Sequence, residues 1–176
     1  MKYFIPMLLV LVLFLTTLWA QDEEVITPPP ERSGIALGYM TTPNSIVYRT
    51  TWNETGAFDF WVDLPEIVVG DIELLELGAG FGYAMFFARN EHACFMFRPQ
   101  LSVRYLYDSV GSLELGIGAA GAVVAYLDSL GIPDTDIYAG ISLGAVGQIS
   151  NNISAFHLIL TQRRPFGLVI GVMKYF

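Results

Sequence analysis

The sequence is short of cysteine, histidine and basic residues, and each shortage removes a class of function. The single cysteine, Cys94, excludes an intramolecular disulfide, and we interpret it as a small buried residue rather than a reactive thiol. His92 and His157 are the only histidines, and no His/Cys cluster suggests a metal site, so we expect no metal or other cofactor. The net charge of −8 argues against nucleic acid as a partner, because nucleic acid selects basic surfaces.

Long apolar runs are also scarce, although 53% of the residues are hydrophobic. The unbroken run from Met7 to Leu15 follows Lys2 and leads to small or polar residues up to Ala20. This order is typical of a secretory signal peptide, with an uncleaved membrane anchor as the alternative. We therefore expect residues 1–20 to be a signal peptide.

The rest of the chain divides into two parts. Residues 21–32 are acidic and rich in proline, which favours a short extended lead-in and no place in a sheet; if the rest of the chain is an outer-membrane barrel, this lead-in is periplasmic. Residues 33–176 are long enough for one domain.

Four segments between positions 72 and 150 alternate so regularly that one face of each never carries a charge. The odd positions are apolar or small, and the charges within these strands fall on even positions: Glu76, Arg98, Arg104, Glu114 and Asp136. Because successive side chains of a strand point to opposite faces, each strand has one apolar face and one small, polar face. This pattern is typical of a transmembrane β-barrel with lipid outside and a polar interior. A soluble lipocalin-like carrier would place the apolar face inside.

Turn signals divide residues 33–176 into eight predicted strands: 33–52, 57–64, 72–87, 92–107, 112–127, 135–150, 153–162 and 166–176. We interpret 33–52 as one strand that is kinked or bulged at Pro43. A true turn at Thr42 to Ser45 would give nine strands and force a tenth or an odd barrel. Pro99 lacks a ladder donor, so we expect a bulge there.

The predicted fold is all-β, an up-and-down antiparallel transmembrane β-barrel of eight strands, with ten as the alternative. An even number returns both termini to the periplasmic side. The longest predicted strands exceed the 9–11 residues that cross a bilayer, so we expect the barrel to project beyond the membrane.

The last strand carries alternate apolar residues and ends in Phe176. It resembles the C-terminal strand of bacterial outer-membrane proteins, and residues 33–176 resemble small barrels of the OmpA/OmpX type in architecture. The resemblance implies a location in the bacterial outer membrane after cleavage of the signal peptide, contact with outer-membrane lipid, and recognition of Phe176 by the barrel-assembly machinery. We expect a monomer.

Hairpin geometry predicts a polar network in the lumen. If the turn near Asn90 pairs positions that sum to 180, Glu76 faces Arg104. Sums of 218 and 262 in the next two hairpins place Glu114 beside Arg104 and Gln148 beside Glu114. We expect these four residues to form one layer near the periplasmic end, the end that carries both termini.

Further lumen charges are predicted to find partners or space. Arg98 is expected to lie between Gly82 and Ala120, which leave room for its side chain, and Asp59 and Asp63 are expected to flank Arg49. An eight-stranded barrel is just wide enough for side chains to fill, and buried charges must be paired. The network therefore predicts a lumen that is largely plugged rather than open.

The sequence predicts a structural or surface-interaction role, with a narrow pore for small solutes as the alternative. A lipid-modifying outer-membrane enzyme is a third hypothesis, because such enzymes need a serine with a nearby histidine at the lipid-exposed rim. His157 has no serine two residues on, and His92 is expected at an extracellular hairpin beside Glu91. We therefore expect no enzymatic activity and no catalytic residue.

Overall fold

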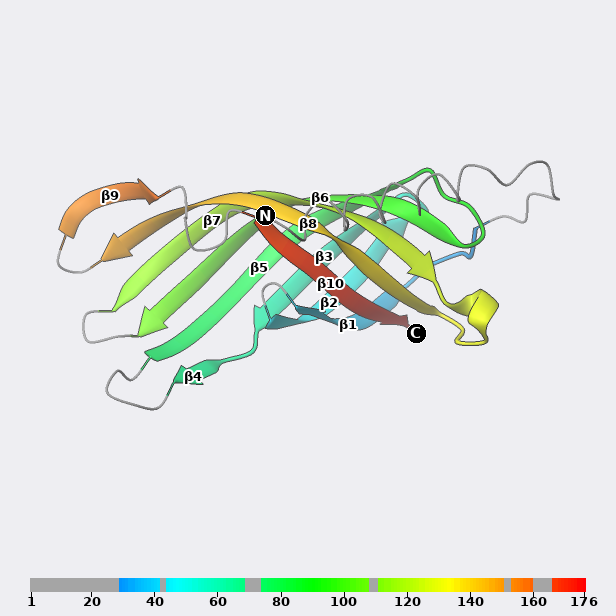
Figure 1. Ribbon diagram of the computed structural model, residues 1–176, viewed down its shortest axis with the longest axis horizontal. Coiled ribbons are helices and arrows are strands. Elements are labelled where there is room, and N and C mark those ends of the chain that lie inside the picture. Colours follow the sequence, from blue (N-terminus) through cyan, green and yellow to red (C-terminus); the bar gives the residue numbers. More distant parts are fainter. Residues whose placement is uncertain (1–28, 42–43, 69–73, 108–110, 151–152, 160–165) are drawn as a thin grey trace, which may run out of the picture.

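The computed structural model describes residues 29–41, 44–68, 74–107, 111–150, 153–159 and 166–176, and the side chains of 66–75 and 150–166 are not part of that description. The predicted signal peptide and most of the lead-in fall outside these residues. Nearly all of the rest is antiparallel sheet (Figure 1). The strands and the one short 3₁₀ helix are β1 (Ile35–Thr41), β2 (Asn44–Asn53), β3 (Gly56–Asp63), β4 (Glu66–Val68), β5 (Leu74–Phe87), β6 (Ala93–Tyr107), β7 (Ser112–Tyr126), η1 (Asp128–Leu130), β8 (Thr135–Ser150), β9 (Ile153–Ile159) and β10 (Phe166–Tyr175).

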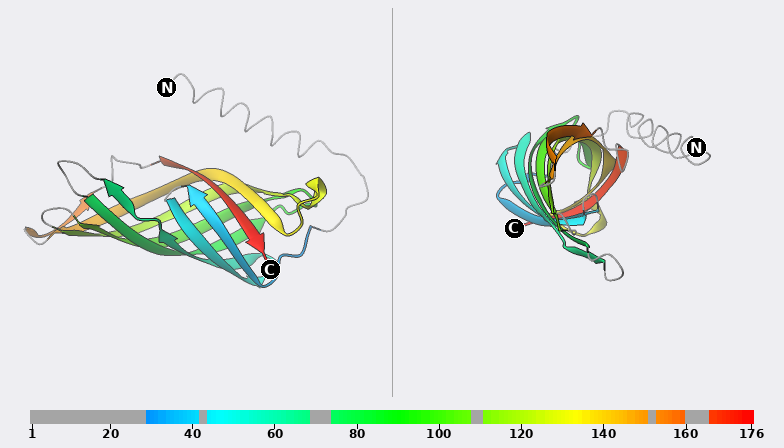
Figure 2. Two further views of the ribbon diagram at one scale, coloured as in Figure 1. Left: turned by 90° about the horizontal axis from the view of Figure 1, so that it is seen from below. Right: turned by 90° about the vertical axis from the view of Figure 1, so that its left-hand side faces the viewer.

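These strands close into a barrel with eight strand positions. Strands that follow each other along the chain pair, except β3 with β4 and β9 with β10, and β10 closes the ring by pairing with both β8 and β1. Because β3 and β4 both pair with β5, they share one position, and β9 and β10 share another beside β8. The view along the barrel shows the closed ring (Figure 2, right). The predicted all-β, eight-stranded, up-and-down barrel is confirmed.

Two of the predicted strand boundaries are wrong, and the errors compensate in the count. Residues 33–52 form the β1–β2 hairpin, in which Thr41 pairs with Asn44. The exposed parity changes across this hairpin, from Leu37 and Tyr39 on β1 to Ile46 on β2, and a continuous strand without a bulge would have kept it. At the other end of the chain, the predicted strands 153–162 and 166–176 occupy one position of the barrel instead of two.

Because the first predicted strand is a hairpin, each connection from β2 to β8 lies at the end of the barrel opposite to the predicted one. The terminal end is where β1 begins and β10 ends, with Ala36 beside Tyr175. The β2–β3, β5–β6 and β7–β8 connections also lie at this end, and the others lie at the opposite, far end. His92 was expected at the end away from the termini and lies at the terminal end instead.

The expected bulge at Pro99 is also wrong. Pro99 pairs with Ala119 in an unbroken register with β7. On the other side, the pairing of β6 with β5 skips the positions around Pro99 and resumes in the same register. The missing ladder donor therefore costs contacts with one neighbour and does not displace the strand.

The register fixes the tilt of the strands. A ladder that starts at Ile137 of β8 and runs once around the barrel, through β10, β1, β2, β3, β5, β6 and β7, returns to β8 at Gly147, ten positions further along. Ten residues rise about 33 Å, while eight strand spacings span about 38 Å. The strands are therefore tilted by about 40° from the barrel axis, as in other barrels of this size.

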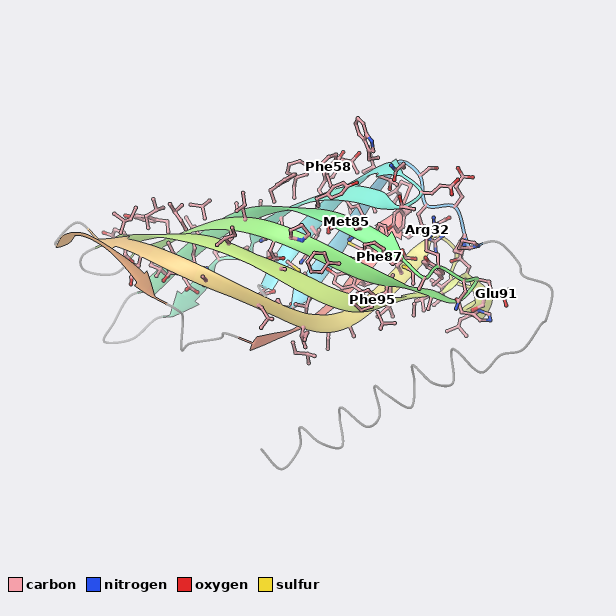
Figure 3. All side chains as sticks on the ribbon, turned by 90° about the horizontal axis from the view of Figure 1, so that it is seen from above. Arg32, Phe58, Met85, Phe87, Glu91 and Phe95 are labelled. Atoms are coloured by element: carbon pink, nitrogen blue, oxygen red, sulfur yellow. The ribbon has the colours of Figure 1, made fainter. Side chains whose placement is uncertain are left out.

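The two faces of the wall are divided as the alternation predicts. The outward residues Leu77, Phe95, Ile117 and Ile141 are 46%, 44%, 65% and 56% exposed, whereas most of the inward residues that alternate with them are small or polar. Figure 3 shows the side chains that project from the outside of the barrel, Phe95 among them. Among the described residues, no helix is long and apolar enough to cross a membrane.

Candidate functional site

Polar side chains gather at three levels of the lumen, and the middle level is the most deeply buried. It consists of Arg49 from β2, Asp59 from β3 and Arg98 from β6, each at most 1% exposed, and we call it the waist cluster. Arg49 donates from Nε and Nη2 to the two carboxylate oxygens of Asp59, at 2.6 and 2.8 Å. Arg98 donates from Nη1 to Asp59 Oδ2 at 3.0 Å. One carboxylate therefore bridges two arginines across the lumen.

The remaining donors of the two arginines are directed at sulfur, aromatic and amide groups, and Arg98 Nε donates to Gln100 Oε1 at 3.2 Å. Arg49 donates to Tyr175 Oη at 3.2 Å and contacts Met96 Sδ at 3.4 Å, and Arg98 contacts Met40 Sδ at 3.0 Å. The guanidinium of Arg98 lies 5.1 Å from the ring centre of Trp61, and that of Arg49 lies 5.2 Å from the ring centre of Phe86. Such contacts stabilise a desolvated cation whose charge is incompletely matched by carboxylate.

Large side chains and small partners fill the lumen around the waist cluster. Met40, Met96, Tyr138 and Met173 are each at most 1% exposed. A Cβ added at Gly82 would lie 2.9 Å from Cγ of Arg98, so only glycine leaves room for that side chain. Arg98 pairs in register with Ala120, as predicted, but Gly82 pairs with Gln100, and the side chain of Arg98 reaches Gly82 diagonally.

The far cluster lies nearer the far end and is looser. Arg104 of β6 is surrounded by Asp63, Glu76 and Glu114 at 3.7, 3.7 and 3.9 Å. The side chain of Arg104 is 38% exposed, and each of these separations is too long for a hydrogen bond. Such ion pairs contribute little to stability, on the order of 0–1 kcal/mol. The far cluster is therefore loosely packed and lies at a hydrated end of the lumen.

The predicted registers around Arg104 are partly correct. Arg104 pairs with Glu114, and Glu114 pairs with Gln148, as expected. Across the β5–β6 hairpin, however, Arg104 pairs with Gly78 rather than Glu76, because the turn is two positions longer than assumed. Glu76 still approaches Arg104 diagonally.

Besides its predicted place beside Glu114, Gln148 has a hydrogen-bond partner that was not predicted. Its Nε2 donates to Ser112 Oγ at 3.1 Å. The layer as a whole lies at the far end, away from the start of β1 and the end of β10, and its predicted place at the terminal end is wrong because the first predicted strand is a hairpin.

The terminal cluster closes the other end of the lumen and was not predicted. Arg32, which precedes β1, is 9% exposed and donates to Asp136 Oδ1 at 2.8 Å and also to the carboxylate of Asp128. Its guanidinium lies over the rings of Tyr126 and Tyr175, at 5.4 and 5.3 Å from their centres. The lead-in thus caps the barrel through one side chain (Figure 3).

Mutual charge and hydrogen bonding set the ionisation of this cap. The hydrogen bond from Arg32 holds the pKa of Asp128 below its ordinary value, against a smaller opposing effect of burial. Burial alone would lower the pKa of Arg32, but its bonds to Asp128 and Asp136 outweigh this and keep that pKa above its ordinary value. Both groups are therefore charged at neutral pH.

We expect acid to release this cap. Because the pKa of Asp128 is lower in the folded protein than in the unfolded chain, its contribution to stability is complete above about pH 4, the ordinary aspartate range, and is lost as the pH falls through the lower folded value. Thermal unfolding of the protein between pH 5 and pH 2, followed by the heat-dependent change in gel mobility, should show this loss. Asp128→Asn is the matched variant, and it should lack this part of the pH dependence; an unchanged profile would contradict the assignment.

The remaining candidate residues do not join these clusters. His92 is 45% exposed and lies 3.1 Å from Glu91 in the β5–β6 connection. His157 pairs in register with Gln148, but its side chain lies outside the described residues. Cys94 is buried, as predicted. Within the described ranges, no group of three or more His, Cys, Asp or Glu residues is placed to hold a metal ion.

Sequence reasoning missed two features of the site. Asp59 and Arg98 lie on β3 and β6, which are not neighbouring strands, so no hairpin register connects them. Arg32 was placed in a lead-in to which no role was assigned. The available signal was its position directly before the first strand, together with the acidic residues at 128, 134 and 136.

Comparison of the chain with protein-family models, with curated proteins and with solved structures finds no match in any of the three.

Proposed function

We propose that this protein is a small β-barrel of the bacterial outer membrane, with a structural or surface-interaction role and a lumen closed to solutes. The observation that carries the proposal is the direction of the side chains. Large apolar residues cover the outside of a closed barrel, where water would leave them unburied, while charges are collected inside. In hydrocarbon this arrangement is favourable, because the apolar residues face lipid and the closed ring pairs the backbone of the strands with neighbours on both sides over most of the wall.

The same observation argues against a soluble carrier. A carrier barrel buries apolar side chains around a ligand cavity and turns its charges to water. Here the lumen at the waist contains an arginine–aspartate–arginine bridge, and the outside carries residues such as Ile117 and Ile141. Aromatic residues are also grouped on the outside, where Phe58 packs against Phe81 and Tyr83 with ring centres 5.8 and 5.1 Å apart.

Targeting and assembly follow the same proposal. Residues 1–20 would direct export and be removed, and Phe176, at the end of the strand that closes the barrel, would be read by the barrel-assembly machinery. The terminal Phe176 is 76% exposed, and its backbone N–H donates to the carbonyl of Ile35 at 2.9 Å. The backbone of Phe176 therefore takes part in closing the barrel, while its phenyl side chain remains accessible. Membrane fractionation and heat-modifiable gel mobility test the location and the barrel together.

The waist cluster supports a closed lumen over a narrow pore. Arg49, Asp59 and Arg98 span the interior at the level where methionine and tyrosine side chains fill the remaining space. Opening a path would break charge-assisted bonds of a buried network, which costs several kcal/mol. The far cluster is hydrated, but it lies on one side of this closure.

We expect the purified, folded protein to produce no steady conductance in planar lipid bilayers. The barrier is the waist cluster, so raising the protein concentration should increase insertion without opening a current. A conducting porin in the same bilayers provides the positive control for insertion and detection. Reproducible open steps at neutral pH would overturn the closed lumen and favour the small-solute pore.

A further inference from the structure

The barrel wall has very different heights on its two sides. The strands β6, β7 and β8 contain 15, 15 and 16 residues, whereas β1 contains 7 and β2 and β10 contain 10 each. The longer strands extend far beyond the β1–β2 hairpin at the far end (Figure 2, left). The β1–β2 side and the β6–β7 side lie opposite each other in the ring.

The register converts these lengths into heights. With a tilt of about 40°, each residue along a strand adds about 2.5 Å along the barrel axis, and each step to the next strand along a ladder adds about 3 Å. The terminal rim is then level to within about 6 Å around the whole barrel. Above this rim the wall rises to about 20 Å at the β1–β2 hairpin and to about 35 Å at β6 and β7.

The short side also becomes polar at its top. Tyr39 donates from its hydroxyl to Asn44 Oδ1 at 2.7 Å, and Thr41 pairs with Asn44 in the last rung of the hairpin. The highest outward apolar residue of β2 is Ile46, which lies about 5 Å below Asn44. On the long side, the outward residues remain apolar up to Tyr105, Tyr107 and Ile149, which are 43%, 56% and 43% exposed.

A flat bilayer cannot match both sides. The apolar band of such barrels is about 25 Å tall, so the short side lacks several ångströms of cover at the far leaflet. Tilting the barrel would not remove the mismatch, because the terminal rim is level and would be lifted on one side. A short hydrophobic span is met by local thinning of the bilayer, by snorkelling of long flanking side chains or by association of copies, and residues 39–44 contain no lysine or arginine that could snorkel.

We propose that the β1–β2 side of the barrel binds a locally thinned bilayer, with phospholipid headgroups of the far leaflet drawn down to the polar rim at Tyr39, Thr41 and Asn44. The inference rests on the proposed membrane location and adds to it an orientation in the membrane plane. The partner of this surface is the headgroup region of a phospholipid, while the β6–β7 side meets lipid of ordinary thickness. Lipid beside β1 and β2 is consequently compressed.

Two outward isoleucines form a matched pair for the test. Ile46 and Ile141 lie at nearly the same height, about 15 Å above the terminal rim, and are 53% and 56% exposed. Ile46 lies just below the short rim, whereas the wall continues for about 20 Å above Ile141. In a flat bilayer, labels at the two positions would report the same depth.

The experiment uses the full barrel in phosphatidylcholine vesicles with 18-carbon monounsaturated chains. Ile46→Cys and Ile141→Cys are made separately in a Cys94→Ala background and carry a nitroxide, whose depth is measured from collisions with oxygen and a nickel chelate. We expect the label at position 46 to be about 5–8 Å shallower than the label at position 141. In vesicles with 12-carbon chains, whose thickness approaches the height of the short side, the difference should shrink to below about 3 Å.

The outcomes separate this inference from the proposed function. Equal depths within about 2 Å in 18-carbon lipid, with both labels in hydrocarbon, would overturn the local thinning and leave the membrane barrel standing. Water exposure of both labels in a folded, heat-modifiable protein would overturn the membrane location itself. If Ile46→Cys does not fold, Tyr48→Cys paired with Ala139→Cys repeats the comparison at a second common height.

Discussion

Replacing Asp59 by asparagine is expected to destabilise the barrel by about 3–5 kcal/mol, the cost of leaving buried charge without its partner. Asp59 is the only carboxylate within hydrogen-bonding distance of Arg49 and Arg98 among the described residues, and all three side chains are inaccessible to water. Asparagine keeps the shape of the side chain but leaves two guanidinium groups facing each other. Urea unfolding in lipid vesicles, followed by gel mobility, measures the loss.

Asp63→Asn is the matched control, because Asp63 lies on the same strand and the same face. Its carboxylate accepts from Ser45 Oγ at 2.6 Å and lies 3.7 Å from the half-exposed Arg104. Asparagine keeps an acceptor for Ser45 Oγ, so we expect a cost of only about 1–2 kcal/mol, from the lost charge on this hydrogen bond and from the lost ion pair with Arg104. Equal unfolding midpoints for the two variants would contradict the central role of Asp59.

A triple variant separates charge from shape at the waist. Replacing Arg49 and Arg98 by methionine in the Asp59→Asn background removes both uncompensated charges and keeps most of the volume. Hydrophobic replacement of a buried ion network is often neutral or stabilising, so most of the stability lost in Asp59→Asn should return. If the triple variant is as unstable as the single one, packing rather than charge explains the effect of Asp59.

The architecture could be predicted because it depends on a period of two residues repeated over long strands. The outward positions of β5 to β8 follow from parity alone, and parity does not depend on the exact ends of the strands. The β1–β2 hairpin was missed because Pro43 is compatible both with a turn and with an irregularity in an edge strand. The available signal was the change of apolar parity between Tyr39 and Ile46, which a strand without a bulge cannot produce.

Pairwise contacts could be predicted only where a hairpin fixes them. The registers of Arg104 with Glu114 and of Glu114 with Gln148 follow from the lengths of two turns, and the error at Glu76 came from a turn of misjudged length. Contacts across the lumen depend on the shear and radius of the closed ring, which no single hairpin encodes. The bridge from Asp59 to Arg98 and the cap formed by Arg32 are of this kind.

The outer face allows a second test with a large expected effect, because its exposure has opposite consequences in water and in lipid. Ile141 is 56% exposed and lies near the middle of the expected hydrocarbon band. At a water-exposed position, Ile141→Arg would change the free energy of unfolding by no more than about 0.5 kcal/mol. Near the midplane of a bilayer, an outward arginine costs about 2–4 kcal/mol, and we expect this larger loss in vesicles.

Ile132→Arg provides the internal reference for this measurement. Ile132 is 49% exposed, follows η1 at the terminal end, and lies outside the strands, so arginine there should be tolerated within about 0.5 kcal/mol. Comparison of the two variants by urea unfolding in the same vesicles cancels the general effect of an added positive charge. A cost at position 141 that exceeds the cost at position 132 by at least about 1.5 kcal/mol supports burial of the outer face in lipid. Equal, small costs would show that water covers this face, and the membrane barrel would then have to be abandoned.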